Sequence, residues 1–308
     1  MMTFQKIVLL GGTGQIGKAL IRFYQDKAKE ISVFTRGVSR IENNVNYLNW
    51  NGESLTQYVD EFEKVDLLIN LVGKNVNCRY TEENKKEIFE SRTKSIVALS
   101  EVITLTSTPP KVWIQAASAT IYRHSEDKAM TEKNGEIGEG FSVEVCKKWE
   151  ATFEKESQKF PNIRKVILRT SIVLSENEGA FPRLKTMTKF GLGGKQGNGH
   201  QMVSWIHEAD VVGIIDFIVK NESIYGTFNC TAPNPITNQL FMKQLRQSLG
   251  VKFGLPAPKT LLEIGAVIIG TETELILKSR WVIPEKLTEL GYKFQYPTIE
   301  KAFKHLIH

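Results

Sequence analysis

A glycine-rich segment near the N-terminus has the composition and spacing of a binding site for phosphate groups. The segment Gly11-Gly12-Thr13-Gly14-Gln15-Ile16-Gly17 connects an apolar run to an amphipathic stretch. Gly11 would allow a tight turn, Gly14 would let backbone approach a phosphate, and Gly17 would let a helix pack closely on a strand. The unpaired N–H groups at the start of that helix favour an anion such as a pyrophosphate. The alternative is a glycine-rich turn that binds nothing.

The end of the second apolar run bears on which dinucleotide would suit this segment. The run Ile31–Thr35 is followed by Arg36, where a site for NAD(H) usually places an acidic residue against the ribose 2′-hydroxyl. A guanidinium at this point can pair with a 2′-phosphate, so the sequence favours NADP(H) over NAD(H). The alternative is that Arg36 is a solvated loop charge.

Polar and small residues close the next two strands. Gly73 follows the run Val65–Val72 and would let backbone contact the cofactor. Ser118, just after Val112–Ala117, is a candidate catalytic hydroxyl, or it bonds to local backbone. Tyr122 is a candidate proton donor, or an aromatic wall of the nicotinamide pocket. With a usual pKa of about 10, its phenol would need a nearby cation, and Lys147 or Lys148 on the next helix could supply one.

Strand-like and helix-like segments alternate over the first two-thirds of the chain. Strands are expected at Lys6–Leu10, Ile31–Thr35, Val65–Val72, Val112–Ala117, Lys165–Thr170 and Gly226–Cys230. Helices are expected at Gln15–Lys29, Glu82–Ile103, Gly140–Lys159 and Ala209–Val219. Short, continuous apolar strands separated by helices predict an α/β fold of the Rossmann type, with a doubly wound parallel sheet. Ligands of such sheets bind at the carboxyl ends of the strands, where the polar residues above lie.

The alternation stops after Thr170, which indicates a second unit. A glycine-rich stretch follows at residues 191–199, and helical patterns recur at Leu240–Leu249 and Lys259–Ile269. We expect an NADP-binding domain of residues 1–174 plus 205–230, and a smaller, mainly helical C-terminal lobe of residues 175–204 plus 231–308. The cleft between them would hold the substrate. The longest apolar stretch, Ile264–Gly270, is too short to span a bilayer and would be a buried helix segment.

Composition narrows the classes of partner. The 308 residues carry a formal net charge of +6, but no run of five Lys or Arg residues, so neither nucleic acid nor membrane is an expected partner. The three cysteines, Cys78, Cys146 and Cys230, have no metal-ligand spacing, and no metal site is expected. They favour a reducing compartment, and we expect a cytoplasmic protein, monomeric or homodimeric.

Several segments have counterparts in one enzyme superfamily. The glycine segment, Ala117–Tyr122 and Gly197–Asp210 resemble the short-chain dehydrogenase/reductase superfamily in its extended form. More narrowly, the chain is similar to an epimerase-like subgroup labelled nucleoside-diphosphate-sugar epimerase or cell-division-inhibitor-like. That similarity is carried by Arg79–Lys85, Ser91-Arg92, Val145–Glu150, Ser204–His207, Asn229–Pro233 and Tyr292–Thr298. The expected cofactor contacts are Gly11, Thr13, Gly14, Gln15, Ile16, Gly17, Thr35, Arg36, Leu71, Val72, Gly73 and Arg92.

Two departures from the superfamily leave the activity open. The usual catalytic Tyr-x-x-x-Lys pair is missing, because none of the eight tyrosines has lysine four residues later. Ser142 and Cys146 stand in its place. Val203 replaces the arginine that usually pairs with a nucleotide-sugar diphosphate. Cys146 is expected to be a small buried residue rather than a nucleophile, and His207 a packed histidine rather than a base.

Two functions from different classes follow. The first is an NADP(H)-dependent oxidoreductase or epimerase-like enzyme acting on a small polar substrate, with a nonstandard route for the proton. The second is a noncatalytic NADP(H)-binding sensor or scaffold, which the missing pair motivates. A role in RNA binding or cell division has only mild basicity and a family label behind it.

Overall fold

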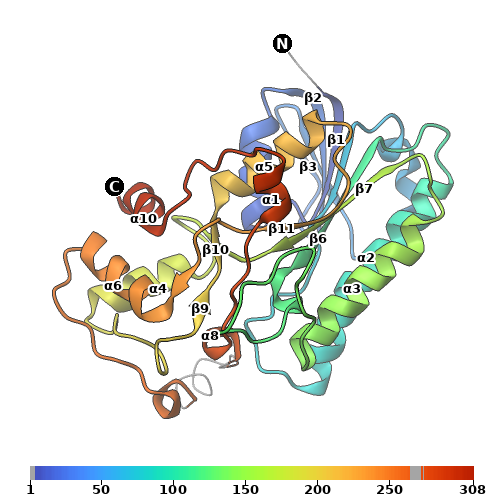
Figure 1. Ribbon diagram of the computed structural model, residues 1–308. Coiled ribbons are helices and arrows are strands. Elements are labelled where there is room, and N and C mark those ends of the chain that lie inside the picture. The colour runs from blue at the N-terminus through green and yellow to red at the C-terminus, as the bar shows by residue number, and fades with distance from the viewer. Residues whose placement is uncertain (1–3, 264–271, 273) are drawn as a thin grey trace.

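A mostly parallel sheet forms the centre of the molecule (Figure 1). The computed structural model describes residues 4–263, 272 and 274–308. The strand order is β11-β7-β6-β5-β1-β2-β4-β3, and each neighbouring pair is parallel except β3 and β4. The strands are β1 (Phe4–Leu10), β2 (Ala28–Thr35), β3 (Arg40–Glu42), β4 (Val45–Asn49), β5 (Leu67–Asn70), β6 (Val112–Ser118), β7 (Arg164–Thr170) and β11 (Gly226–Cys230).

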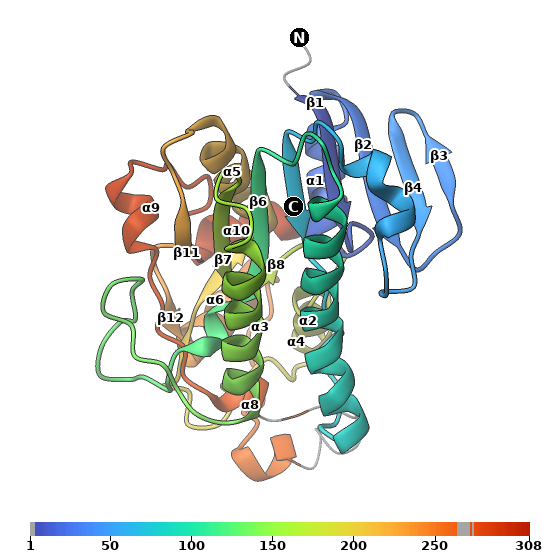
Figure 2. The same ribbon diagram turned by 90° about the vertical axis from the view of Figure 1, so that its right-hand side faces the viewer.

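Helices cover both faces of this sheet. Helices α1 (Gln15–Tyr24) and α5 (Glu208–Lys220) pack on one face, and α2 (Glu82–Thr104) and α3 (Phe141–Ser157) lie side by side on the other (Figure 2). Alternate side chains of β1 point to opposite faces: Ile7 joins the core under α1 and α5, whereas Val8 joins the core under α2 and α3. Both faces are therefore buried, and the expected doubly wound fold is confirmed.

A smaller lobe with its own apolar cluster lies beside the carboxyl ends of the strands (Figure 1). Its cluster includes Phe181, Phe241 and Phe303, from α4 (Phe181–Lys189), α6 (Asn238–Ser248) and α10 (Ile299–Ile307). Two short ladders lie outside the main sheet and contribute side chains to this cluster. They pair β8 (Ile172–Leu174) with β10 (Trp205–His207), and β9 (Met202–Val203) with β12 (Ile236–Thr237). The domain boundaries given above stay a prediction.

Part of the C-terminal region returns to the sheet domain. Helix α8 (Glu274–Leu277) precedes a strap of residues 278–283, and α9 (Glu285–Glu289) follows it. Leu287 of α9 packs in the same apolar core as α1 and α5. Consequently, a segment that the sequence places with the smaller lobe contributes to the core of the sheet domain.

The expected elements differ from the observed ones mainly at their ends. The first helix ends at Tyr24 rather than Lys29, because Ala28 already begins β2. The strand expected over Val65–Val72 is only β5, and the β3–β4 hairpin was not predicted. The segment Ile264–Gly270 lies outside the described residues. In the part of the chain that the structure describes, no helix is long and apolar enough to cross a membrane.

Candidate functional site

The glycine segment forms the turn between β1 and α1, and close contacts explain its glycines. Gly11 has a φ of +74°, and a Cβ on it would lie 3.2 Å from the backbone of Leu71 and Val72. A Cβ on Gly17 would lie 2.3 Å from backbone atoms of Gly12. Gly17 thus allows the helix to pack on the turn itself, rather than on the strand as expected. A Cβ on Gly14 would meet only the carbonyl oxygen of Gly11, at 3.6 Å, so Gly14 faces open space.

The start of α1 is free to receive an anion. Its N-cap is Gly14, no side chain caps the helix, and its first turn contains no acidic residue. The first-turn N–H groups of a helix have no acceptor within the helix, so their positive end is left for a ligand. Thr13 is exposed beside them. The side chain of Gln15 points elsewhere, because its Nε2 donates to the carbonyl oxygen of Val173 at 3.3 Å, and Ile16 packs against the core.

Two arginines follow β2, and only one is held by other residues. Arg40 forms an ion pair with Glu42 at 2.6 Å and lies 3.7 Å from the centre of the Tyr47 ring. Arg36 is exposed and forms no ion pair within the described residues. The hydroxyl of Thr35 accepts from the N–H of Gly37 at 3.2 Å, and it lies 3.3 Å from the Thr13 hydroxyl. Arg36 is therefore the available cation at this strand end.

The end of β5 is built around a buried amide. Asn70 donates to Ser95 and to Gln115, both at 3.1 Å, and its Oδ1 accepts from the N–H of Val72 at 3.1 Å. These bonds fix the backbone of the Leu71-Val72-Gly73 segment. A Cβ on Gly73 would lie 3.1 Å from the guanidinium carbon of Arg92. The segment and Arg92 consequently form one wall at this edge of the sheet.

Arg92 is a buried cation without a carboxylate partner among the described residues. Its Nη1 donates to the carbonyl of Ile88 at 2.9 Å and its Nη2 to that of Lys74 at 3.1 Å. The guanidinium lies 4.9 Å from the centre of the Trp149 ring. Burial lowers the pKa of Arg92.

Ser118, at the end of β6, is the N-cap of a short 3₁₀ turn, η2 (Ala119–Ile121). Its hydroxyl accepts from the N–H of Thr120 at 3.2 Å and donates to the Thr120 hydroxyl at 3.0 Å. The Nε of Arg280 donates to the same hydroxyl at 3.3 Å. Ser118 thus makes the local backbone hydrogen bond that was one of its two expected roles. It is also linked, through the Thr120 hydroxyl, to the guanidinium of Arg280, which the sequence did not indicate.

Tyr122 lies in a closed hydrogen-bond network. It is 1% exposed, and its hydroxyl donates to Asn229 and accepts from Arg169, both at 2.9 Å. Arg169 in turn binds Glu150 through two hydrogen bonds, of 2.8 and 2.7 Å. Burial raises the pKa of Tyr122 although Arg169 opposes the shift. This geometry favours a structural role for the phenol, and catalysis by Tyr122 stays a prediction.

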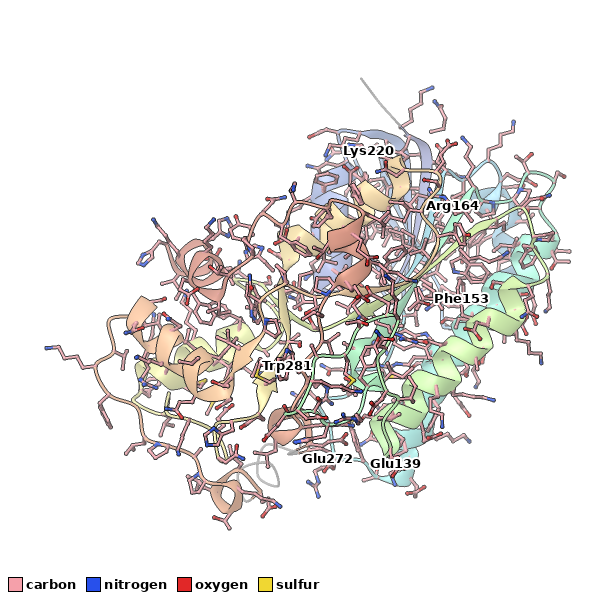
Figure 3. The ribbon with its side chains drawn as sticks, in the orientation of Figure 1. Glu139, Phe153, Arg164, Lys220, Glu272 and Trp281 are labelled. Atoms are coloured by element: carbon pink, nitrogen blue, oxygen red, sulfur yellow. The ribbon has the colours of Figure 1, made fainter. Side chains whose placement is uncertain are left out.

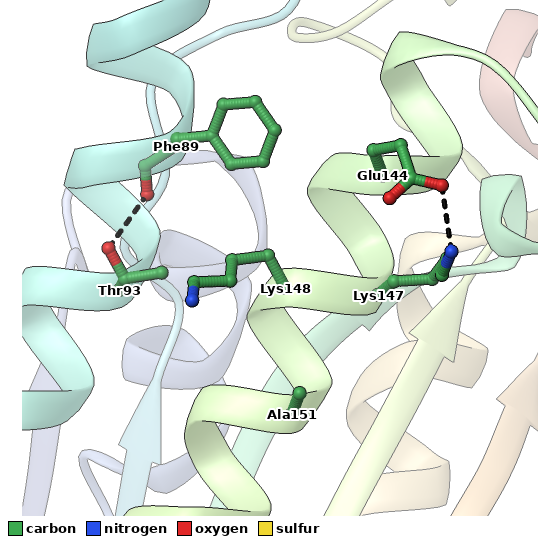
Figure 4. Close-up of a pocket in the computed structure, with 6 residues that line it drawn as sticks. All are labelled: Phe89, Thr93, Glu144, Lys147, Lys148 and Ala151. Atoms are coloured by element: carbon green, nitrogen blue, oxygen red, sulfur yellow. Dashed lines mark hydrogen bonds and ion pairs between the residues drawn. The ribbon is translucent and has the colours of Figure 1, made fainter.

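The two lysines suggested as cations for Tyr122 lie elsewhere. Lys147 and Lys148 are exposed, and Lys147 pairs with Glu144 at 2.8 Å. Both line a shallow depression of about 520 Å³ between α2 and α3 (Figure 4). None of the expected catalytic or cofactor-binding residues lines that depression.

Helix α3 carries the residues that stand in place of the Tyr-x-x-x-Lys pair. The hydroxyl of Ser142 donates to Glu274 at 2.5 Å. Cys146 is 3% exposed, and burial raises the pKa of its thiol to about 12. The prediction of a small buried residue is thereby confirmed. The packed role of His207 is also confirmed: its ring is 1% exposed, caps α5 and lies 3.1 Å from His305.

The strap of residues 278–283 places Arg280 at this edge, and Arg280 was not among the expected site residues. The N–H of Arg280 donates to Met202 at 2.8 Å, and its carbonyl accepts from Ser204 at 2.7 Å. Trp281 then accepts from the N–H of Met130 at 2.7 Å. Figure 3 labels Trp281, which belongs to the strap, and Glu272, which precedes it in the chain. No local motif marks Arg280, because it lies far along the chain from Ser118.

Comparisons with known proteins agree with this architecture. The family model described as "NAD dependent epimerase/dehydratase family" matches residues 7–231. The chain belongs to this family. A second model, described as a domain of unknown function (DUF1731), matches residues 257–306, which include α8, the strap, α9 and all of α10 except its last residue.

Similar proteins cover nearly the whole chain. An epimerase family protein of Staphylococcus aureus is 31% identical over 98% of this chain and 99% of its own. The epimerase family protein YfhF of Bacillus subtilis is 32% identical over 98% of this chain and 97% of its own. The crystal structure of human epimerase family protein SDR39U1 with NADPH has a TM-score of 0.85 at 26% identity, covering 98% of this chain and 99% of that one.

Proposed function

We propose that this member of the family is an NADP(H)-dependent enzyme, of the oxidoreductase or epimerase type, that acts on a small polar substrate. The uncapped start of α1 beside Gly14, with Arg36 at the end of β2, carries the proposal. The amides of the turn would hold the pyrophosphate, and Arg36 would pair with the 2′-phosphate. The structurally similar human protein, whose structure contains NADPH, supports the same cofactor.

The remaining expected contacts would line the cofactor along the strand ends. The backbone of Leu71-Val72-Gly73 is held by Asn70, and Arg92 lies directly behind Gly73. When bound, NADP(H) would supply hydride transfer. Ser118 would orient a hydroxyl or carbonyl of the substrate, because it is partly exposed at the end of β6. Because the usual pair is absent, a residue outside the Tyr-x-x-x-Lys positions would have to move the proton.

Arg36 provides the test of the cofactor. Titration of the protein with NADPH and NADH should show tighter binding of NADPH. Arg36→Gln should raise the Kd for NADPH by about 10-fold, the effect of about 1.4 kcal/mol, and leave that for NADH unchanged. Arg40→Gln is the matched control, because Arg40 is already paired with Glu42. Equal NADPH affinity in Arg36→Gln and the parent protein would contradict the assignment of Arg36.

Turnover requires a separate test. A panel of carbonyl and hydroxyl compounds should yield slow oxidation or reduction of the cofactor, and Ser118→Ala should reduce kcat. If NADP(H) binds but no compound of the panel oxidises or reduces it, the proposed enzymatic activity would be contradicted.

A noncatalytic NADP(H)-binding sensor or scaffold is the second candidate. It is favoured by the two residues that stand in place of the usual catalytic pair. Ser142 is hydrogen-bonded to Glu274, and Cys146 is buried. Such a protein would change its oligomeric state or its partners when NADPH binds. Sizing and pull-down experiments with and without NADPH should then differ, and an unchanged profile would leave the sensor without support.

A further inference from the structure

Among the buried side-chain atoms without a hydrogen-bond partner in the described residues, three belong to residues around helix α3 and the strap. They are Nη2 of Arg280, Nε of Arg92 and the hydroxyl of Tyr80. Buried donors are nearly always paired in folded proteins, because leaving one unpaired costs about 1–3 kcal/mol. All three atoms can donate a hydrogen bond. Together they indicate a missing acceptor.

The three groups gather around one point, although they come from distant parts of the chain. All three lie against helix α3 or its contacts: the ring centres of Tyr80 and Phe141 are 4.6 Å apart, and the guanidinium of Arg92 lies 4.9 Å from the centre of the Trp149 ring. Glu274, at the start of α8 just before Arg280, accepts from Ser142 of the same helix at 2.5 Å. Arg92 and Arg280 both oppose the rise in the pKa of the Cys146 thiol, which lies between these contacts on α3.

We call Tyr80, Arg92, Lys278 and Arg280 the cationic cluster. Through Thr120 the cluster connects to Ser118, so it lies where a substrate would meet the cofactor edge.

The charges of the cationic cluster do not balance. Arg92, Lys278 and Arg280 supply three positive charges. Glu274 supplies one negative charge: its carboxylate lies 3.4 Å from Lys278, accepts from Ser142 and raises the pKa of Arg280 against the effect of burial, so two of the three positive charges stay unbalanced.

The carboxylate of Glu272, two residues before Glu274, also has partners of its own. Glu272 binds Arg79 at 3.5 Å and the N–H of Tyr80 at 2.9 Å. Burial lowers the pKa of Arg280 and of Lys278. A guanidinium nevertheless stays protonated in proteins, so it needs an anion when water is excluded.

We propose that the cationic cluster binds an oxyanion of the substrate, a carboxylate or a phosphate, with Arg280 and Tyr80 as the direct donors. The planar fork of Arg280 suits either group, because both present two oxygens at the spacing of two guanidinium N–H groups. Arg92 adds positive charge from the side of Gly73. This inference rests on the proposed function, since it names the substrate class of that same site.

The test uses protein saturated with NADPH, so that cofactor phosphates cannot account for the signal. Inorganic phosphate and acetate are titrated by calorimetry against chloride at matched ionic strength. The parent protein should bind at least one of them, and Arg280→Gln should raise that Kd by about 10-fold while the Kd for NADPH stays unchanged. The stronger probe assigns the oxyanion to phosphate or carboxylate. Arg22→Gln is the control, because Arg22 is an exposed arginine on α1.

Tyr80→Phe is the second variant, and it removes a single oxygen. It should raise the Kd for the anion by about 3-fold without lowering the stability of the anion-free protein, because the hydroxyl has no partner there. Anion binding that is absent in the NADPH-loaded parent, or unchanged in both variants, would overturn the cluster's role. Failure to bind NADPH while Arg280-dependent anion binding persists would instead overturn the proposed cofactor and leave the anion site standing.

Discussion

Two partly buried arginines near the end of β6 differ in whether the chain supplies a counter-charge. Arg169 binds both oxygens of Glu150 and the hydroxyl of Tyr122, so its charge and most of its donors are satisfied within the chain. Arg280 bonds to Thr120 and to the carbonyl of Lys278, and its Nη2 has no partner among the described residues. The first arginine stabilises the fold. The second is held in place by the strap without an anion of its own, as expected of a group that meets a ligand.

His207 is a buried ionisable side chain that avoids an unpaired charge in another way. Burial together with His305 lowers its pKa to about 4. Histidine can lose its charge near neutral pH, whereas a guanidinium cannot. A buried histidine therefore needs no carboxylate. A buried arginine needs either an anion or enough other acceptors, such as the carbonyl groups of Ile218, Val219 and Ile224 that accept from Arg164.

The largest effect is expected from unpairing Arg169. Glu150→Gln should lower the free energy of unfolding by about 3–5 kcal/mol, because it leaves a buried guanidinium without its counter-charge. Urea unfolding measures this change. Arg169→Gln should cost a similar amount by stranding Glu150. If both variants unfold at the parent's urea midpoint, the Arg169–Glu150 pair does not stabilise the fold.

The next effect concerns pH. The pKa of His207 in the folded protein lies below its usual 6.5, so the unfolded chain takes up a proton that the folded chain does not as the pH falls from about 6.5 to 4. Stability should be fully present above that window and should fall by about 3 kcal/mol across it. Urea midpoints at pH 7 and pH 5 measure the slope. His207→Gln should flatten it, while the exposed His200→Gln should not.

A smaller effect separates the two tyrosines. Tyr122→Phe removes the hydroxyl between Arg169 and Asn229 and should lower the free energy of unfolding by about 1 kcal/mol. Tyr80→Phe should leave it unchanged or slightly raised. Thermal unfolding of both variants tests the contrast. A large loss of kcat in Tyr122→Phe, with stability unchanged, would favour the catalytic interpretation instead.

The smallest change in stability is expected from Arg280→Gln. Removing a cation that lacks a carboxylate should alter the free energy of unfolding of the anion-free protein by less than about 1 kcal/mol, against several for Arg169→Gln. Adding phosphate or acetate should then stabilise the parent protein more than this variant. Equal losses in the two arginine variants would show that Arg280 is also structural.

Local sequence patterns anticipated the elements of the sheet domain and the turn at Gly11. The first helix was expected to end too late in the chain, because no glycine or proline marks a helix end between Tyr24 and Ala28. The role of Cys146 followed from residue type alone, because a cysteine amid helical apolar residues packs inside. The partners of Tyr122 could not be predicted: Arg169 and Asn229 reach it from β7 and β11, and nothing local marks them.

The sequence by itself determined the α/β fold, the glycine turn and the cation at the end of β2, because each depends on residues within one strand, turn and helix. Only the tertiary structure decided which charged groups are paired. Arg169 and Glu150 lie on neighbouring elements and meet, whereas Arg280 is brought to Ser118 by a strap about 160 residues further on. Pairing depends on distance in space, and distance along the chain does not reveal it.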